Sequence, residues 1–363
     1  MSHSPGNHTA PSSGWSRAIL HVDMDAFYVN VHILDNPEDS GIPLAIGGKP
    51  DQRGVVASAS YEARATGVRS AMPMRTAVKL CPTLKIVPAD WPRIKECSRQ
   101  VMDILAEFGP LEQMSVDEAY IDLSEHLAPV RLSDTIRKRL KAETGLPASV
   151  GLATNKLVAK VASDQNKPEG CTIVLPGTEA RFLSPLPARV IWGIGPRTNE
   201  RLSTLGIETC GQLARASLEM LRAEFGSQSE ALQQRASGID RRQVVTDRGP
   251  AKSISNEWTF DEDTADLQLL GERLEKMVGQ VGKSLRGQSL VAHTVTVKFR
   301  LADFTTYTRQ KTVQNGIDND AEILRLARQI WRENWDQAQQ LRLLGVGVSN
   351  LSEPEVQQLA FKL

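Results

Sequence analysis

The sequence has few cysteines and no long apolar run, and both absences restrict the class of protein. Its four cysteines form no C-x-x-C pair, and they stand at Cys81, Cys97, Cys171 and Cys210. A disulfide framework or a zinc site built on paired cysteines is therefore not predicted. No hydrophobic stretch reaches the length of a membrane-spanning helix. The formal net charge is zero, which argues neither for nor against nucleic-acid binding.

The beginning of the chain is also poor in apolar side chains. Residues 1–14 are rich in Ser, Pro, His and Gly and lack the apolar segment of a signal peptide. We therefore expect a disordered tail over residues 1–16 and, by default, a reducing, cytoplasmic location. The length of 363 residues is sufficient for roughly two to four domains.

Hydrophobic periodicity predicts alternating strands and helices in the first half of the chain. Strands are expected over residues 19–22, 43–46, 55–58 and 148–153, and helices over residues 26–34, 74–80, 92–107, 133–143 and 155–165. Ser133 is a candidate N-cap. Residues 112–116 and 119–123 are expected to form a hairpin with Asp117 and Glu118 at its tip. Short helices interrupted by Gly and Pro follow up to about residue 238.

The last third of the chain is predicted to form a separate domain. A polar linker over residues 241–252 precedes a pattern of the order β-α-β-β-α-β, which is typical of a split βαβ domain. The expected elements are a strand near residue 258, a helix over 267–286, strands over 292–301 and 305–312, a helix over 321–335 and a strand over 341–348. Residues 280–311 carry six basic residues against Asp303, a composition that fits either a phosphate-binding stripe or a solvated face.

Two apolar runs, residues 21–28 (HVDMDAFY) and 115–120 (SVDEAY), end in carboxylates. If these strands lie side by side, Asp23, Asp117 and Glu118 form a small acidic cluster with nothing basic in it. Carboxylates that repel one another are tolerated around a divalent cation, and oxygen ligands of this kind suit Mg²⁺. Because Mg²⁺ with few protein ligands completes its shell with waters and substrate phosphates, the pattern predicts phosphoryl or nucleotidyl transfer.

The neighbours of Asp23 are interpreted differently. The main-chain oxygen of Met24 is a further candidate ligand, whereas Asp25 is expected on the other side of the strand in a structural role. A lone Asp at a strand end is more often a turn or cap residue. The assignment of Asp23 to a metal therefore depends on its pairing with the second acidic run.

Basic residues near these acids are expected to hold a triphosphate. Tyr61 and Arg64 lie one helical turn apart on a shared face, and the guanidinium fork of Arg matches phosphate oxygens. Lys167 lies in a loop that Pro168 and Gly170 stiffen. Taken alone, a Y-x-x-R pair is usually a surface pair, and Lys167 by itself is unremarkable.

A glycine-containing turn and the C-terminal peptide are further candidate binding elements. Gly193, Ile194 and Gly195 precede a helix, where glycines permit close backbone approach and free N–H groups can bind a phosphate. A plain helix–helix turn is the alternative. At the C-terminus, residues 357–363 (QQLAFKL) end in apolar side chains beyond Pro354, which favours a docking peptide over core packing.

Taken together, these motifs resemble those of Y-family translesion DNA polymerases, with most similarity to the bacterial DNA polymerase IV branch. The resemblance runs from about residue 19 to residue 363. It is carried, in this order, by HVDMDAFY (21–28), ASASYEAR (57–64), GVRSAMP (67–73), SVDEAYID (115–122), NKLVAKVASDQNKPEG (155–170), WGIGP (192–196) and KSISNE (252–257). His32 departs from the pattern because an acidic residue is usual there, and Asn30 and Ser60 depart as well.

The resemblance implies an α+β multidomain fold with the right-hand arrangement of polymerases. It implies a ferredoxin-like palm, small fingers, a helical thumb with a helix-hairpin-helix, and a C-terminal split-βαβ little finger. The implied boundaries are a tail over 1–16, palm over 17–26 and 90–174, fingers over 27–89, thumb over 175–240, linker over 241–252, little finger over 253–350 and a clamp-binding tail over 351–363.

The resemblance also implies roles for individual residues. Asp23, Asp117 and Glu118, with the main-chain oxygen of Met24, would hold the metals. The incoming triphosphate would be held by Ser58, Tyr61, Arg64 and Lys167. Tyr28 matches an aromatic steric gate against the ribose 2′-hydroxyl, and Gly193, Ile194 and Gly195 would grip a DNA phosphate. The sliding-clamp peptide would include Gln358, Leu359, Phe361 and Leu363.

The implied activity is template-directed, error-prone DNA synthesis on a primer–template in damage tolerance, without proofreading. It would use deoxynucleoside triphosphates and two Mg²⁺ ions, for which Mn²⁺ can substitute, in a monomer associated with the nucleoid and the sliding clamp. A palm-type nucleotidyl cyclase, a metal nuclease and a catalytically silent DNA-binding scaffold are alternatives. Incubation with labelled deoxynucleotides and a primed template separates all of them.

Overall fold

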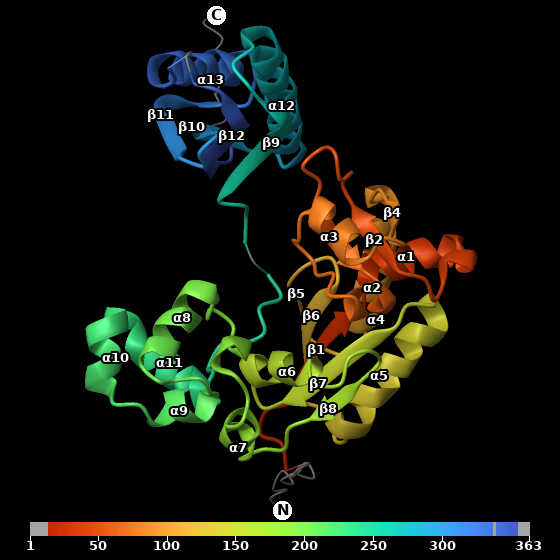
Figure 1. Cartoon of the computed structure of the whole chain (residues 1–363). Coiled ribbons are helices and arrows are strands. Elements are labelled where there is room, and N and C mark those ends of the chain that lie inside the picture. The colour runs from red at the N-terminus through yellow and green to blue at the C-terminus, as the bar shows by residue number, and fades with distance from the viewer. Residues whose placement is uncertain (1–13, 248, 337–338, 355–363) are drawn as a thin grey trace, which may run out of the picture. The chain divides into compact units, whose positions relative to one another are not determined.

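The computed structural model describes residues 14–247, 249–336 and 339–354, and the chain divides into two compact units at the boundary between Arg248 and Gly249 (Figure 1). The first unit contains a five-stranded sheet in the order β5-β6-β1-β7-β8. Its strands are β1 (Ile19–Met24), β5 (Leu111–Gln113), β6 (Glu118–Asp122), β7 (Ala148–Ala153) and β8 (Cys171–Ile173). Neighbours are antiparallel except β7 and β8, which are parallel.

Strand alternation along β1 gives the two faces of this sheet different partners. Leu20 and Val22 are buried in the core that helices α4 (Trp91–Ala106) and α5 (Pro129–Thr144) share with the sheet. Ile19 belongs to the core on the opposite face, which helix α6 (Lys156–Ser163) covers. The polar residues of β1 therefore share the α6 face with Ile19.

The expected N-cap of α5 is wrong. The helix begins at Pro129, whose fixed φ and missing N–H suit the first helical position. Ser133 lies inside the helix, fully buried, and its hydroxyl donates to the Pro129 carbonyl at 2.8 Å. A serine in the second turn of a helix can bond back to its own helix in this way, so the residue type alone did not locate the helix start.

A smaller three-stranded sheet, in the order β3-β2-β4, also belongs to the first unit and packs in hydrophobic clusters of its own. It contains β2 (Leu44–Gly47), β3 (Val56–Ala59) and β4 (Lys85–Val87). Four short helices accompany it: α1 (Phe27–Asp35), η1 (Pro37–Asp39), α2 (Tyr61–Ala65) and α3 (Met74–Leu80). The sequence predicted α3 and β7 to the residue, whereas the three-residue strands β4 and β8 were not predicted.

Beyond β8 the first unit is helical. Its elements are α7 (Glu179–Leu183), η2 (Ala188–Val190), α8 (Pro196–Thr204), α9 (Cys210–Arg215), α10 (Leu218–Phe225), η3 (Gly226–Gln228) and α11 (Ser229–Ala236). Side chains from most of these helices enter the same core as α6. The α6 face of the sheet is therefore continuous with the helical part.

The second unit has the predicted β-α-β-β-α-β order. Its elements are β9 (Ser253–Thr264), α12 (Leu267–Gly287), β10 (Val291–Leu301), β11 (Thr306–Ile317), α13 (Asp320–Asn334) and β12 (Leu341–Ser352). The antiparallel sheet has the order β11-β10-β12-β9, and both helices contribute to one core with it. Because β12 lies between β9 and β10, the unit is a split βαβ domain.

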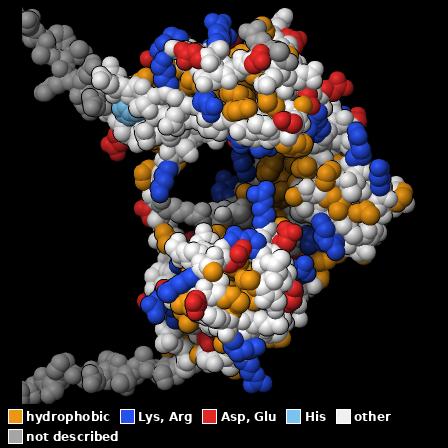
Figure 2. Space-filling view, turned by 60° about the vertical axis from the view of Figure 1, so that its left-hand side comes forward, with side chains coloured by type: hydrophobic (Ala, Val, Ile, Leu, Met, Phe, Trp, Pro, Cys, Tyr) orange, Lys and Arg blue, Asp and Glu red, His pale blue; other side chains and the backbone are white. Residues whose placement is uncertain are grey.

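Charges are interspersed on the surface that Figure 2 shows, where Lys and Arg side chains alternate with Asp and Glu. Two cations of the basic stretch 280–311 are paired: Arg286 with Asp320 at 2.7 Å and Lys298 with Glu257 at 2.8 Å. Within the described ranges, no helix has the length and apolar character needed to cross a membrane.

Candidate active site

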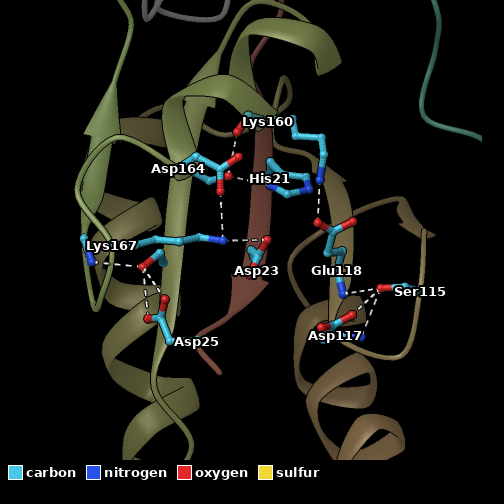
Figure 3. A network of polar contacts seen from close by, with 12 residues as sticks. His21, Asp23, Asp25, Ser115, Asp117, Glu118, Lys160, Asp164 and Lys167 are labelled. Carbon is cyan, nitrogen blue, oxygen red and sulfur yellow. Dashed lines mark hydrogen bonds and ion pairs between the residues drawn. The ribbon is translucent and has the colours of Figure 1, made fainter. Parts of the chain in front are cut away.

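The carboxylates of the two acidic runs meet at the end of β1. Asp23 and Glu118 are directly opposite each other in the antiparallel pair β1–β6. The main-chain N–H of Met24 donates to the Asp117 carbonyl oxygen at 3.0 Å, which fixes the hairpin tip beside the end of β1. Glu118 is the first residue of β6, so the turn ends at Asp117. Figure 3 shows the three acids on neighbouring elements.

The expectation of a cluster with nothing basic in it is wrong. Lys167, which was expected near the acids, and Lys160, which was not, neutralise two of them (Figure 3). Lys167 Nζ lies 2.8 Å from the Asp23 carboxylate, and Lys160 Nζ contacts the Glu118 carboxylate. The Asp117 carboxylate instead accepts from the Ser115 hydroxyl. In this arrangement, no group of three His, Cys, Asp or Glu side chains within the described part of the chain lies close enough to hold a metal ion.

Burial and the lysines act in opposite directions on the acids. Burial raises the pKa of Asp23 to about 7, although the nearby ammonium of Lys167 lowers it. Burial also raises the pKa of Glu118, but the hydrogen bond and charge of Lys160 lower it overall. For Lys167, burial lowers the pKa, and the carboxylates of Asp23 and Asp164 more than reverse this effect. The ionised form of each of these two carboxylates is therefore stabilised by the lysine beside it.

The donor set fits a hard divalent cation. Asp23, Asp117, Glu118 and the main-chain oxygen of Met24 supply only oxygen, the ligand type that Mg²⁺ and Mn²⁺ prefer. Half-buried carboxylates next to one another require positive charge, which the lysines supply in this structure. A divalent cation would replace that charge once the carboxylates turn from their present partners.

A pocket of about 130 Å³ collects most of the predicted site residues. It is lined by Asp23, Met24, Ala26, Phe27, Tyr28, Ala57, Ser58, Tyr61, Arg64, Ser70, Asp117 and Lys167. These residues come from β1, α1 and the turn between them, from β3, α2 and the loop after α2, from the hairpin, and from the loop after α6, segments far apart in the chain. Glu118 is outside this lining and faces Lys160.

Asp25 organises one wall of this pocket. Its buried carboxylate accepts from the Tyr61 hydroxyl at 3.1 Å, the Ser149 hydroxyl at 2.9 Å and the main-chain N–H of Glu169 at 2.8 Å. Ser149 lies in β7 between residues of the opposite core, so it is on the α6 face together with Asp23. The expectation that Asp25 lies on the other side of the strand is wrong, because residues two apart share a face. Its contacts agree with a structural role.

The aromatic and cationic side chains of the pocket are held by local contacts. The Arg64 guanidinium lies 4.8 Å from the centre of the Tyr61 ring, and its Nε donates to the Ala59 carbonyl at 3.0 Å. The Tyr28 ring meets Trp91 edge-on, with centroids 5.5 Å apart and planes at 71°. Such contacts restrict the rotation of these side chains.

The glycine turn has the expected geometry, whereas the C-terminal peptide lies outside the described residues. Gly193 has a φ of +97°, a conformation that favours glycine. Gly195 precedes α8 with Pro196 at the first helical position. The candidate clamp residues Gln358, Leu359, Phe361 and Leu363 all fall in the range 355–363, which the structure does not describe.

The departures at His32, Asn30 and Ser60 have local structural explanations. His32 Nε2 lies 2.7 Å from the Asp39 carboxylate, which also binds Lys85 at 2.5 Å. The Asn30 side chain donates to the Asp25 carbonyl, and the Ser60 hydroxyl caps α2 by accepting from the Ala63 N–H. These side chains stabilise the segments around the pocket.

Sequence reasoning missed the residues that surround the acids. Lys160, Asp164 and Ser163 project from α6 or its end, and His21 lies on β1 in the same face as Asp23. A signal was present for His21, because it stands two positions before Asp23 in a strand. For Lys160 the signal was absent, since its position opposite Glu118 depends on how α6 packs on the sheet.

Comparison with known proteins assigns the chain to a family. Residues 22–164 match the impB/mucB/samB family, residues 251–361 match its C-terminal domain, and residues 190–240 match the thumb domain described for DNA polymerase-iota. DNA polymerase IV of Dehalococcoides mccartyi is 41% identical over 347 residues, covering 94% of this chain and 89% of that protein. DNA polymerase IV 3 of Mesorhizobium japonicum is 42% identical over 355 residues, covering 96% and 98%.

A solved structure gives the same assignment. The Y-family DNA polymerase chimera of Dbh and Dpo4 matches with a TM-score of 0.82 and 25% identity, covering 93% of this chain and 99% of that one. This match confirms the predicted fold class. Members of the family are nucleotidyltransferases that act on DNA and nucleotides with divalent metal ions. The chain therefore belongs to the Y-family of DNA polymerases, in its DNA polymerase IV branch.

Proposed function

We propose that this chain adds deoxynucleotides to a primer 3′-end on a DNA template by two-metal nucleotidyl transfer, without proofreading. Its family activity is error-prone translesion synthesis in damage tolerance and DNA repair. The observation that carries the proposal is the pocket in which Asp23 and Asp117 meet Tyr61, Arg64 and Lys167. A nucleoside triphosphate requires both an acidic site for cations and donors for its phosphates.

The acids would hold the metals. Asp23, Asp117, Glu118 and the main-chain oxygen of Met24 would bind two Mg²⁺ ions, for which Mn²⁺ can substitute. When bound, such ions activate the primer 3′-hydroxyl and neutralise charge on the phosphates. Before the metal ions bind, Asp23 is held in place by an ion pair with Lys167, and Glu118 by an ion pair with Lys160.

Polar and basic residues of the pocket would hold the triphosphate. Arg64 would bind phosphate oxygens through its fork, Ser58 offers a hydroxyl donor and Lys167 adds a point charge. Tyr61 gives its hydroxyl proton to Asp25 in this structure, so it would bind the triphosphate after turning from that carboxylate, while its ring supports Arg64. These groups act where negative charge develops during transfer, which stabilises the transition state. Asp25 orients two parts of the pocket, because its carboxylate binds the Tyr61 hydroxyl and the loop that carries Lys167.

Tyr28 would exclude ribonucleotides. It lines the pocket beside Asp117, and its ring is held against Trp91. A ring fixed at the sugar position would collide with a 2′-hydroxyl but not with a hydrogen. The contact with Trp91 supports this role because a freely rotating ring could move aside.

Other parts of the chain would bind DNA and partners. We assign the palm to 17–26 and 90–174, the fingers to 27–89, the thumb to 175–240, the linker to 241–252 and the little finger to 253–350, with tails over 1–16 and 351–363. The turn Gly193–Gly195 would bind a DNA phosphate through main-chain N–H groups. The protein would act as a monomer on nucleoid DNA in the cytoplasm.

The C-terminal residues Gln358, Leu359, Phe361 and Leu363 would dock in a groove of the sliding clamp. Their apolar side chains at alternate positions are typical of peptides that enter such grooves. Deletion of residues 358–363 should leave extension of a short primer unchanged and remove the stimulation by a loaded clamp. Equal stimulation of the shortened chain would exclude this docking role.

Primer extension tests the proposed activity. The Asp117→Ala protein should lose extension of a primed template while retaining DNA binding, because the change removes a metal ligand and leaves the DNA-binding surfaces intact. Glu125→Ala, an exposed acid shortly after β6, is the matched control and should extend normally. Extension by Asp117→Ala at the normal rate would refute the assignment, and cyclised or shortened products would indicate a cyclase or a nuclease.

A further inference from the structure

His21 is a buried histidine beside the acids, and its hydrogen bonds define its tautomer. The Ser163 hydroxyl donates its only proton to the Lys160 carbonyl at 2.8 Å. The contact of 2.8 Å between His21 Nδ1 and Ser163 Oγ must therefore be donated by the ring. Nδ1 carries the proton, and Nε2 is left as an acceptor. Nε2 is buried and has no hydrogen-bond partner in the described part of the chain.

A buried acceptor without a partner is unfavourable, so its presence calls for an explanation, such as a partner that it gains in another state of the site. His21 shares the α6 face with Asp23, and its ring packs on Tyr120 of β6 with centroids 4.7 Å apart. Figure 3 shows the ring beside the end of the Lys160 side chain, which reaches past it to Glu118.

The two lysines of the site differ in what they would bind after losing their acid. Lys167 contacts Asp23 and Asp164, each at 2.8 Å, so it keeps one carboxylate when the other leaves. Lys160 has an ion pair with Glu118 alone among the pairs of the described residues. If Glu118 turned to a cation, the Lys160 ammonium would be left half-buried beside that cation without a counter-group.

We propose that His21 is a positioning residue whose Nε2 receives the Lys160 ammonium when Glu118 turns from that lysine to a divalent cation. The inference rests on the proposed function, since it describes how the same acids become free to hold metal. Asp164 is the counterpart of His21 for Lys167. Both acids thus have a lysine in the metal-free state, and both lysines have a second acceptor in the loaded state.

If His21 has this role, substitutions of His21 and of Lys160 should change the affinity for metal in opposite directions. Removal of the acceptor should keep Lys160 on Glu118 and weaken metal binding, whereas removal of the ammonium should leave Glu118 free. His21→Phe preserves the ring packing on Tyr120 and removes both nitrogen atoms. His21→Gln restores an oxygen acceptor near the position of Nε2. Lys160→Met keeps most of the aliphatic chain and removes the charge.

The experiment measures Mn²⁺ binding by electron paramagnetic resonance in the full chain. The complex contains a dideoxy-terminated primer on its template and the matching deoxynucleotide, so no chemistry occurs. His21→Phe should weaken Mn²⁺ binding about tenfold, because a hydrogen bond to a charged group is lost. His21→Gln should lie within about threefold of the wild type. In the Lys160→Met background, His21→Phe should have no effect.

A second measurement needs no substitution in the protein observed. In wild-type protein labelled with ¹⁵N-histidine, the His21 Nε2 resonance should move on formation of the Mg²⁺ complex, as a free acceptor becomes bonded. Its assignment comes from the signal missing in His21→Phe or His21→Gln. An unmoved resonance, or a His21→Phe protein that binds Mn²⁺ like the wild type, would overturn the inference about His21 and leave the proposed function intact. Failure of the wild type to take up Mn²⁺ with DNA and deoxynucleotide would instead overturn the proposed function, and the inference with it.

Discussion

The ion pair between Lys156 and Glu112 allows a quantitative test of how the first unit is held together. Lys156 Nζ lies 2.5 Å from the Glu112 carboxylate, and the two side chains are only 4% and 8% exposed. The Glu112 carboxylate also accepts from the Val245 N–H at 2.8 Å, and Lys156 Nζ contacts the Gln243 carbonyl at 3.4 Å. The pair therefore fastens residues 243–245 to the sheet.

Lys156→Met would retain the aliphatic packing and leave the Glu112 carboxylate buried without its cation. Breaking a buried pair in this way costs about 3–5 kcal/mol, a large part of the roughly 5–15 kcal/mol that stabilises a typical domain. Adding Glu112→Gln removes the unpaired charge while the amide oxygen still accepts from Val245. We expect the free energy of unfolding of the double variant to lie within about 1 kcal/mol of the wild-type value. The coupling energy between the two substitutions would then be at least about 2 kcal/mol.

Urea unfolding followed by circular dichroism measures these differences in the transition of the first unit. Trypsin cleavage at Arg241 and Arg242 reports release of the fastened segment. Lys138→Met is the matched control, because Lys138 is 68% exposed in its pair with Asp134, and its loss should cost at most about 0.5 kcal/mol. A Lys156→Met cost below about 1 kcal/mol, or a double variant as unstable as the two single changes added together, would refute the reasoning.

Three further predictions concern the pocket. Tyr28→Ala should admit ribonucleotides in primer extension, and an unchanged preference for deoxynucleotides would remove Tyr28 from the gate. Burial raises the pKa of Asp23 to about 7, whereas the unfolded carboxyl titrates near 3.8, so the unfolded state releases its proton first as pH rises. The free energy of unfolding of the wild type, measured by thermal melts, should therefore fall between pH 4 and pH 7 relative to that of Asp23→Asn, by at most about 4 kcal/mol. Parallel dependences on pH for the two proteins would contradict this. Asp25→Asn should raise the KM for deoxynucleotide more than it lowers kcat, because the amide keeps one acceptor oxygen and turns an NH₂ donor toward either the Tyr61 hydroxyl or the Glu169 N–H. An effect on kcat alone would argue against this.

The sequence predicted elements best where local chemistry is sufficient. Helix α3 follows Pro73 and stops before Pro82, and the buried strand β7 is bounded by Pro147, so periodicity and breakers define both. The strands β4 and β8 have three residues each, which is too short for a pattern, and they exist because neighbouring strands pair with them.

The acids of the site were predictable for the same local reason. Each stands at the end of an apolar strand, and antiparallel pairing of those strands brings the ends together. The expectation for Asp25 failed because residues two apart in a strand lie on the same face, whereas Asp25 was expected on the face opposite to Asp23. Asp25 does share the α6 face with Asp23, but its carboxylate binds β7 and the loop after α6, which removes it from the metal cluster.

The charge balance of the site could not be predicted, because it depends on how closely α6 packs on the sheet. Gly151 in β7 makes this close approach possible: a Cβ at that position would lie 2.2 Å from the Ala159 carbonyl oxygen and 2.4 Å from the Ser163 nitrogen. With no side chain there, the backbone of α6 lies directly on the strand, and Lys160 reaches Glu118. A larger residue at 151 would push the helix outward and separate the lysine from the acid without changing either. The strand ends thus determine where the negative charge lies, while one glycine on a neighbouring strand determines how it is neutralised.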